Sequence, residues 1–281
     1  MEKAEGFRDF VRLFANNRGA VIGLVTLSVI IILALTAPLL FPVGPFSSVG
    51  KPFGIPFGDN LFGTDQLGRD VAAGVVHGAR TSLLIALIAT LISIFAGTTI
   101  GCFAGYYPGR VDNILMRLTE FFQTIPSFVF AIVLVAILQP SLKSIVIAIS
   151  VVTWPPVARL VRGEMMAMRK REFVEACISL GMSDGRIIFQ EILPNILSPI
   201  IVTGSLMVAT AILIESALAF LGLGDPNIMS WGFMIGAGRS FLRTSWWLCA
   251  IPGGAILLTV LSINLIGEGL NDALNPRLRN L

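Results

Sequence analysis

The sequence has few charged residues and very little histidine or cysteine. Charged residues make up 13% of the 281 residues, about half the share of an ordinary soluble domain, while 55% are hydrophobic and the mean hydropathy is +0.84. His77 is the single histidine, which excludes a histidine-based metal cluster within this chain. The three cysteines Cys102, Cys177 and Cys249 have neither the even number nor the spacing of a disulfide framework or a zinc site. The low share of charged residues and the high mean hydropathy argue against a water-soluble globular protein.

Two further classes of function lack the residues that they need. The net charge of +3 is too small and too scattered for a nucleic-acid-binding surface. No G-x-x-x-x-G-K-[ST] pattern is present, so we expect no ATP or other cofactor on this chain itself. An intramembrane enzyme is also disfavoured, because no histidine, cysteine or paired-aspartate site is apparent.

The hydrophobic residues are gathered in six long runs. A helix rises about 1.5 Å per residue and the hydrocarbon core is about 30 Å thick, so about 20 apolar residues cross it. Only helices suit such segments, because their backbone polar groups must be satisfied within lipid. The sequence therefore predicts an all-α, polytopic membrane protein with transmembrane helices at residues 21–41, 82–103, 115–138, 142–161, 197–221 and 247–266.

The basic residues predict the orientation of these helices. Cytoplasmic loops carry the excess of lysine and arginine, and most of the 20 basic residues fall on one side when the N-terminus is inside. The predicted protein is N-in and C-in, with a cytoplasmic segment at 1–20, a retained first helix at 21–41 and an outer loop at 42–81. A five-helix core at 82–266 includes a cytoplasmic loop at 162–195, and a cytoplasmic tail follows at 267–281.

The inner loop has the pattern of two helices joined by a tight turn. Residues 164–180 contain good helix formers without glycine or proline, and Gly181 suits a left-handed C-cap. Ser183 is placed to cap a second helix that begins at Asp184, and Pro194 marks a kink or restart. Periodicity alone also fits two interfacial helices whose basic residues face anionic lipid.

The spacing of particular residues in this loop distinguishes the two interpretations. Glu175-Ala176-Cys177 is followed after three residues by Gly181 and after eleven more by Leu193-Pro194. This spacing resembles the EAA loop of ABC importer permeases, with Cys177 in place of the second alanine. The resemblance implies that the loop docks on a cytoplasmic ATPase, with contact and support from Glu175, Ala176, Cys177, Gly181, Leu193 and Pro194.

Other motifs extend the resemblance over nearly the whole chain. NLFGTDQLGRD at 60–70 and GARTSL at 78–83 resemble the signature of dipeptide, oligopeptide and nickel permeases. Further matches lie at 154–165, 171–176, 215–224 and 267–278, and departures from the family pattern stand at Asn60, Val157, Glu268 and Asn275.

The resemblance implies a one-plus-five-helix permease of the type I ABC importer kind, in a bacterial or archaeal plasma membrane. Its first helix is expected to wrap around a second, homologous permease. Two cytoplasmic ATPase subunits or domains would bind ATP and Mg²⁺, and an extracytoplasmic binding protein would deliver the solute. Membrane lipid is the remaining expected partner.

The outer loop and one buried acid are the other candidate sites. Asp65, Arg69 and Asp70 are expected either to contact the binding protein or to stabilise a turn-rich loop through local ion pairs. Glu215 lies in a long apolar run, where a charge is costly. It is interpreted either as a residue of the transport pathway or its gate, or as a protonated or hydrogen-bonded packing group.

The leading functional hypothesis is an ATP-driven importer of di- or oligopeptides, in which ATPase closure moves the docking helices and opens the bundle outward. The alternative is an ion-gradient-driven secondary transporter or channel in which Glu215 binds the coupling proton. Nickel, opines, glutathione and other amide-bearing solutes stay open as substrates.

Overall fold

The computed structural model describes residues 10–274, and the described chain is mainly helical. Helices form where the apolar runs stand, which confirms the all-α prediction. The α-helices are α2 (Arg18–Leu40), α3 (Val71–Tyr106), α4 (Arg110–Thr124), α5 (Ser127–Leu138), α6 (Leu142–Arg169), α7 (Glu172–Ser179), α8 (Asp184–Arg186), α9 (Leu197–Leu218), α10 (Trp231–Gly238) and α11 (Trp247–Leu274). Shorter π and 3₁₀ segments join some of them: η1 (Ile187–Ile192), η2 (Leu193–Ile196), η3 (Ala219–Leu223) and η4 (Arg239–Phe241).

Within residues 10–274, five helical stretches are long and apolar enough to cross a membrane. They are α2, α3, α6, the continuous stretch Asp184–Leu223 that contains α9, and α11. The structure does not support a straight third span at residues 115–138, because α4 and α5 are bent by 84° relative to each other. Pro126 causes the break, since it holds Ile125 in an extended conformation, with φ −87° and ψ 130°. With 12 residues, α5 is about 18 Å long and too short to cross alone.

Several helices extend beyond the ends that the sequence predicts. The side chain of Asp70 accepts a hydrogen bond from the backbone N–H of Ala72 at 2.8 Å, so α3 begins at Val71 and the outer loop is shorter than 42–81. At the other side of the bilayer α6 continues to Arg169, and α11 continues to Leu274 inside the segment expected to be a tail. Hydropathy finds only the lipid-spanning part of a helix, not the capped turns outside it.

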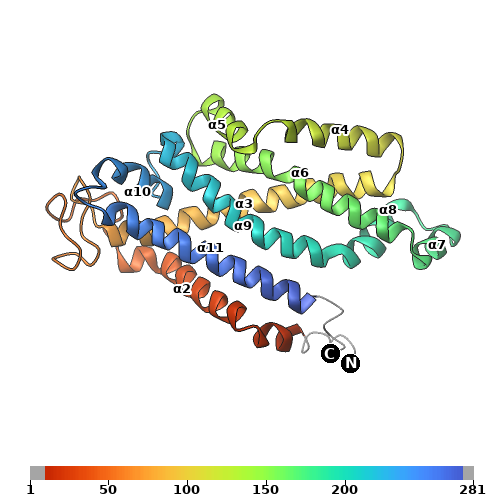
Figure 1. The fold of residues 1–281 in the computed structure, drawn as a ribbon, viewed down its shortest axis with the longest axis horizontal. Helices are drawn as coiled ribbons and strands as arrows, with labels where there is room; N and C mark the ends of the chain where they lie inside the picture. The colour runs from red at the N-terminus through yellow and green to blue at the C-terminus, as the bar shows by residue number, and fades with distance from the viewer. Residues whose placement is uncertain (1–9, 275–281) are drawn as a thin grey trace.

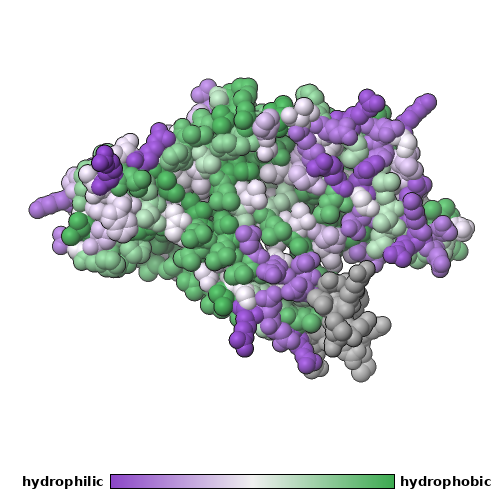
Figure 2. All heavy atoms as spheres, viewed as in Figure 1, coloured by the Kyte–Doolittle hydropathy of each residue, from purple (hydrophilic) through white to green (hydrophobic). Residues whose placement is uncertain are grey.

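The long helices lie side by side along the longest axis of the molecule (Figure 1). The loop before α3 and helix α10 lie at one end, while α7 and α8 lie at the other, together with the start of α2 and the end of α11. Hydrophobic residues dominate the middle of the visible face, and hydrophilic residues gather at the α7 end (Figure 2). This arrangement agrees with an N-in, C-in membrane protein whose motif-bearing inner loop projects from the bundle.

Small residues bring α3 and α6 into close contact. Gly97, Gly101 and Gly105 stand four residues apart on α3, and each faces the backbone or a Cβ atom of α6. A Cβ atom on Gly101 would lie 2.6 Å from the carbonyl oxygen of Ala158 and 2.7 Å from the Cβ of Val161. Glycines at this spacing allow the backbones of two membrane helices to approach closely. We call these three residues and their α6 contacts the glycine seam.

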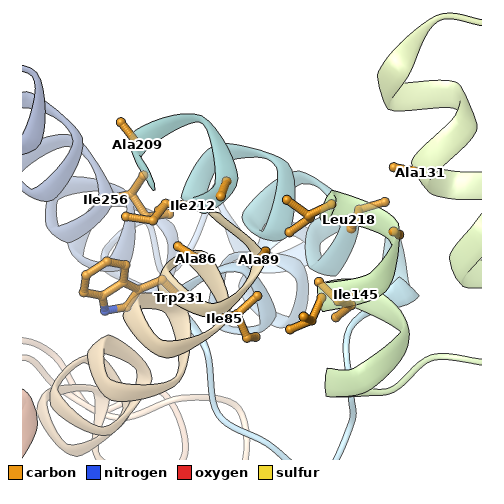
Figure 3. Close-up of a cluster of buried hydrophobic side chains, with 14 of the residues drawn as sticks. Ile85, Ala86, Ala89, Ala131, Ile145, Ala209, Ile212, Leu218, Trp231 and Ile256 are labelled. Carbon is orange, nitrogen blue, oxygen red and sulfur yellow. The ribbon is translucent and has the colours of Figure 1, made fainter. Parts of the chain in front are cut away.

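Two apolar clusters are built around the seam. Figure 3 shows the one nearer α10, where Ala86 and Ala89 of α3, Ile145 of α6 and Ile212 of α9 converge beside Trp231. The second cluster lies nearer the cytoplasmic loop and joins the ends of α3 and α6 to α7, η1 and the start of α9. The central part of the bundle therefore continues without a break into the cytoplasmic loop.

Helix α2 packs on the last helix of its own chain. A Cβ atom on Gly23 would lie 2.6 Å from the carbonyl oxygen of Ser262 in α11, which shows how closely the two helices approach. The opposite face of α2 is exposed and apolar, with Ile22, Val25 and Ile32 among its residues. Contact between this face and a second permease stays a prediction.

The glycine seam predicts that a single methyl group destabilises the bundle. Gly101→Ala would force the methyl into the Ala158 carbonyl, and overpacking of this kind costs about 1–3 kcal/mol. The matched control is Gly163→Ala on α6, where no atom lies within 4 Å of the new Cβ and helix propensity favours alanine by about 1 kcal/mol. Thermal unfolding in mild detergent checks both, and equal transition temperatures for the two variants would contradict the seam.

Candidate functional site

One side of the short helix α7 packs against the cytoplasmic cluster, and the other side is exposed. Val174 is fully buried in the cytoplasmic cluster, where it packs with Ile187 and Ile192 of η1. Glu175 and Ala176 are exposed on the outward side of α7. The first two residues of the predicted docking motif are therefore accessible to another protein.

Cys177 differs from its two neighbours because it is half-buried and packs against the cytoplasmic cluster. A thiol is only slightly larger than the methyl group expected there, and a cysteine behaves as a small apolar residue in such a site. The departure from the EAA pattern therefore falls on the inner side of α7.

Apolar side chains lie on the exposed surface of α7 and its C-terminal turn. Phe173 is 39% exposed, Ile178 49% and Leu180 81%. The sequence analysis did not single these residues out, because exposed apolar residues look like core residues in a one-dimensional pattern. Around Glu175 and Ala176 they form an apolar patch on the part of the chain that projects from the bundle, which is typical of a protein interaction site.

Gly181 ends α7 as the sequence predicts. Its φ is +75°, and the N–H groups of Gly181 and Met182 donate to the carbonyl oxygens of Ile178 and Cys177 at 2.9 and 3.1 Å. This is a Schellman motif, in which the left-handed residue lets the chain reverse.

The helix in front of this turn was expected to run unbroken from 164 to 180, and that prediction is wrong. Helix α6 ends at Arg169, and α7 starts only at Glu172. Arg171 is extended, with φ −82° and ψ 146°, and Ser183 precedes α8 without a side-chain capping bond. The break turns α7 away from the axis of α6.

Asp184 fastens the loop to the end of α3. Its two carboxylate oxygens accept hydrogen bonds from the hydroxyls of Tyr106 and Tyr107, each at 2.9 Å. The hydrogen bond to Asp184 raises the pKa of the Tyr107 hydroxyl, and burial adds to this effect. Arg169 lies 5.3 Å from the centre of the Tyr106 ring. These contacts, here called the tyrosine clamp, join residues that are far apart in the sequence, so no local pattern reveals them.

Leu193 and Pro194 lie where the second loop helix turns into the fifth long helix. The π segment η1 and the 3₁₀ segment η2 replace regular α-helix here, with Pro194 in the first turn of η2. Leu193 packs against the cytoplasmic cluster, whereas Pro194 is exposed. Proline cannot donate the backbone hydrogen bond of a regular helix, which explains the irregular segment. Leu193 therefore faces the packed side of the loop and Pro194 its surface, and the supporting role expected of both stays a prediction.

A partly buried ion pair attaches α4 to α6 near the same end. The guanidinium of Arg162 donates to both carboxylate oxygens of Asp112, through Nε at 2.5 Å and through an Nη at 2.6 Å. Such two-bond pairs fix orientation as well as distance. Sequence reasoning assigned Arg162 only to the cytoplasmic side, because its partner is 50 positions away.

In the outer loop the acidic residues bind backbone amides instead of forming the expected ion pairs. Asp65 accepts from the N–H groups of Leu67 and Arg69 at 2.8 and 2.9 Å, and Asp70 caps α3. The Arg69 guanidinium lies 5.0 Å from the centre of the Phe46 ring, and no acidic side chain pairs with it among residues 10–274. Carboxylates organise tight turns through amides, which the sequence motif alone does not distinguish from ion pairing.

A small pocket with a free volume of about 30 Å³ lies between this loop and α10. Asp65, Gln66, Arg69 and Asp70 line one side, and Phe233 is among the apolar residues opposite. The structure therefore brings the three predicted outer-loop residues together at the surface opposite α7. It places them at the far end of the bundle from the predicted docking residues.

Glu215 is 1% exposed and lies between α9 and α3. One carboxylate oxygen accepts hydrogen bonds from the hydroxyls of Ser82 at 3.2 Å and Ser216 at 3.3 Å. The Ser82 hydroxyl also accepts from the backbone N–H of Trp231, at 3.3 Å. The acid therefore joins three helices near the outer end, and it borders a small cavity that also contacts Asp225 and Ser230.

Comparison with known families agrees with this architecture. The profile described as the binding-protein-dependent transport system inner membrane component matches residues 97–280, and the N-terminal transmembrane domain of oligopeptide transport permease C matches residues 7–51. This chain belongs to the binding-protein-dependent transport permease family.

Relatives at high coverage support the same family. The di/tripeptide transport system permease protein of Pseudomonas aeruginosa is 40% identical over 97% of this chain and 93% of its own length. The oligopeptide transport system permease protein of Bacillus subtilis is 36% identical over 97% of this chain and 90% of its own length. The family membership makes the chain an ABC importer permease rather than a catalytic domain.

Solved structures share the fold at low identity. The inward-facing methionine ABC transporter matches 69% of this permease and 93% of its own chain, with a TM-score of 0.59 and 14% identity. An amino acid ABC transporter matches with a TM-score of 0.55 and 14% identity, over 70% of this chain and 92% of its own. The permease core is therefore a type I ABC importer fold.

The tyrosine clamp predicts a local effect of removing one hydroxyl. Tyr106→Phe would leave the ring in place but remove a partly buried hydrogen bond to Asp184, worth about 1 kcal/mol. We expect hydrogen exchange of the amides in α7 and η1 to become faster by about fivefold, while exchange in α11 stays unchanged. Faster exchange throughout the bundle would show that the hydroxyl supports global stability and not the loop.

For Glu215 the structure predicts that hydrogen bonding matters more than charge. Glu215→Gln retains an acceptor oxygen for Ser82, so its unfolding temperature should stay close to that of the parent. Glu215→Leu leaves the Ser82 hydroxyl without this buried acceptor, which costs about 1–3 kcal/mol. Thermal unfolding in detergent compares the two, and equal losses for glutamine and leucine would show that the carboxylate itself is required.

Proposed function

We propose that this chain is one of two membrane subunits of an ATP-driven importer that carries di- or oligopeptides into the cell. The observation that carries this proposal is the exposed motif-bearing helix α7 on a permease fold. The peptide substrate is supported by two relatives that align over nearly the whole chain and are named as di/tripeptide and oligopeptide permeases. Bacterial relatives also support a location in the inner membrane.

In this proposal α7 is the element on which the cytoplasmic ATPase acts. The apolar residues Phe173, Ile178 and Leu180 would enter a groove on that subunit, with Glu175 and Ala176 between them. Cys177 and Val174 hold the other side of α7 against the cytoplasmic cluster. A push on the exposed face is therefore passed to the packed face of the same helix.

From α7 the displacement has two contiguous routes into the bundle. Val174 passes it to η1 and the start of α9, and the tyrosine clamp passes it to the end of α3. The glycine seam then makes α3 and α6 move together, because closely packed surfaces do not deform continuously. The ion pair of Asp112 and Arg162 carries α4 with α6. ATPase closure would in this way rearrange the bundle as a unit.

The outer end would receive the solute. The pocket beside Asp65, Arg69 and Asp70 offers charged and apolar groups to an extracytoplasmic binding protein. Glu215 couples α9 to α3 and to the start of α10, so its hydrogen bonds would have to follow any opening between these helices. Its proposed part in gating is thus to hold helices together, not to bind the solute.

The remaining chemistry belongs to partner chains. Two ATPase subunits or domains would bind ATP with Mg²⁺, a second permease would complete the pathway, and this chain would hold no cofactor. An ion-gradient transporter needs no ATPase dock, so the exposed α7 surface and the family membership favour the ATP-driven mechanism.

The experiment is ATP hydrolysis by the complex, co-expressed from neighbouring genes and reconstituted in lipid with its binding protein. Ala176→Trp places a large ring on the exposed face of α7 without touching its buried side. We expect the stimulation of ATP hydrolysis by a dipeptide-loaded binding protein to fall at least tenfold. This loss is expected whether the ATPase stays in the complex or dissociates from it. The matched control Ile137→Trp adds the same ring at an exposed position on α5 and should retain the parental stimulation.

Full stimulation of the Ala176→Trp complex would overturn the docking role. Replacing the dipeptide by nickel in the loaded binding protein tests the substrate: stimulation by nickel and not by dipeptide would overturn the peptide assignment while leaving the ATPase coupling intact. Uptake that follows a proton gradient with no ATPase in the purified complex would support the alternative.

A further inference from the structure

A long apolar groove runs along the side of the bundle between α2, α3, α9 and α11. Its free volume is about 550 Å³, which is within the usual range of small-molecule pockets. Its walls are almost entirely aliphatic, with Ser205 and Arg80 as the polar exceptions, and include Leu27, Ile31, Leu84, Leu87, Val208 and Ile263. Nothing in the proposed coupling or delivery of solute uses this surface.

The one cation of this groove lies at its outer end. Helix α3 has 36 residues and is about 54 Å long, so it extends beyond a hydrocarbon core of about 30 Å on both sides when it is centred. Arg80 lies about 14 Å from the outer end of α3, near the outer boundary of that core. The groove residues Leu84 and Leu87 follow one and two turns deeper.

Arg80 is exposed and unpaired within the described chain. No salt bridge links it to an acidic residue among residues 10–274. It also lines a second cavity of about 390 Å³ on the outer side, next to His77, Thr81 and Asn227. Arg80 and Leu84 line both cavities, so the guanidinium lies where the groove adjoins the outer cavity, in which His77, Thr81 and Asn227 are the other polar residues among mainly apolar ones.

We propose that this groove binds a phospholipid of the outer leaflet, with its phosphate on Arg80 and an acyl chain between α2 and α3. An arginine guanidinium offers paired N–H donors that match phosphate oxygens, and a cation at the bilayer boundary lacks another counterion here. The outer cavity holds the rest of the headgroup, where His77 and Asn227 provide polar contacts. The lipid thereby fills the space between α2 and the helices of the core.

An acyl chain suits the groove better than a polar solute. A chain gains no hydrophobic energy by moving from bilayer to protein, so selectivity has to come from packing and from the phosphate contact. The aliphatic walls provide the packing, and Arg80 provides the only charge. A peptide would instead leave its backbone polar groups without partners in this groove.

Lipid retention by the tagged full-length chain, purified in mild detergent with the chains that accompany it, tests this proposal. The probes are dioleoylphosphatidylglycerol and dioleoylglycerol, which share acyl chains but differ in the phosphate, and bound lipid is counted by native mass spectrometry. We expect the phospholipid to be retained and Arg80→Gln to lose it at least fivefold, with Arg80→Lys intermediate. The control Arg243→Gln removes another exposed cation that lines neither cavity and should retain the parental amount.

A second pair of variants tests the chain-binding part separately. Leu84→Trp fills the stretch shared by both cavities and should displace the lipid, whereas Leu91→Trp at an exposed position outside them should not. The proposal would be overturned if dioleoylglycerol were retained as well as the phospholipid, or if Arg80→Gln retained the parental amount of phospholipid. It would also be overturned if inorganic phosphate displaced the bound phospholipid. A disulfide in native membranes between an accompanying chain and the thiol introduced by Leu84→Cys would also overturn the proposal, because it would show that protein occupies the groove.

Discussion

The close approach of α3 and α6 is the contact on which the rest of the permease depends. Three glycines at intervals of four residues remove the side chains that would hold the two backbones apart. In lipid there is little hydrophobic drive for helices to associate, so van der Waals contact along such a surface provides much of the attraction. The two apolar clusters lie along this pair, one toward α10 and one toward α7. The seam thus makes the outer and cytoplasmic clusters parts of one packed helix pair.

Polar contacts lie toward both ends of the bundle. Glu215 and Ser82 join α9 to α3 near the outer end, while the tyrosine clamp and the Asp112–Arg162 pair join helices near the cytoplasmic end. Buried polar groups in a membrane protein need partners, and Glu215 and Ser82 satisfy that need for each other, whereas the contacts at the cytoplasmic end are only partly buried. The apolar contacts thus bring the helices together, and the polar contacts determine which parts have to move together when one end is displaced.

The candidate docking helix illustrates how a motif and its physical setting differ. The spacing of Glu175, Gly181 and Pro194 was sufficient to recognise the loop, and the left-handed turn at Gly181 followed from the residue type. The break after Arg169 was not predicted, because Lys170 and Arg171 are compatible with a helix. Tertiary packing of Val174 favours a separate α7, and local propensity cannot reveal such a preference.

The sequence by itself determined the helical membrane class, five of the six predicted spans, the long inner loop and the family to which the chain belongs, because these depend on hydropathy and on residue order along the chain. Tertiary structure decided what depends on distant partners. It paired Asp112 with Arg162 and joined Tyr106 to Asp184. Hydrogen bonds and packing between residues 50 or more positions apart leave no local periodicity, so only the folded chain reveals them.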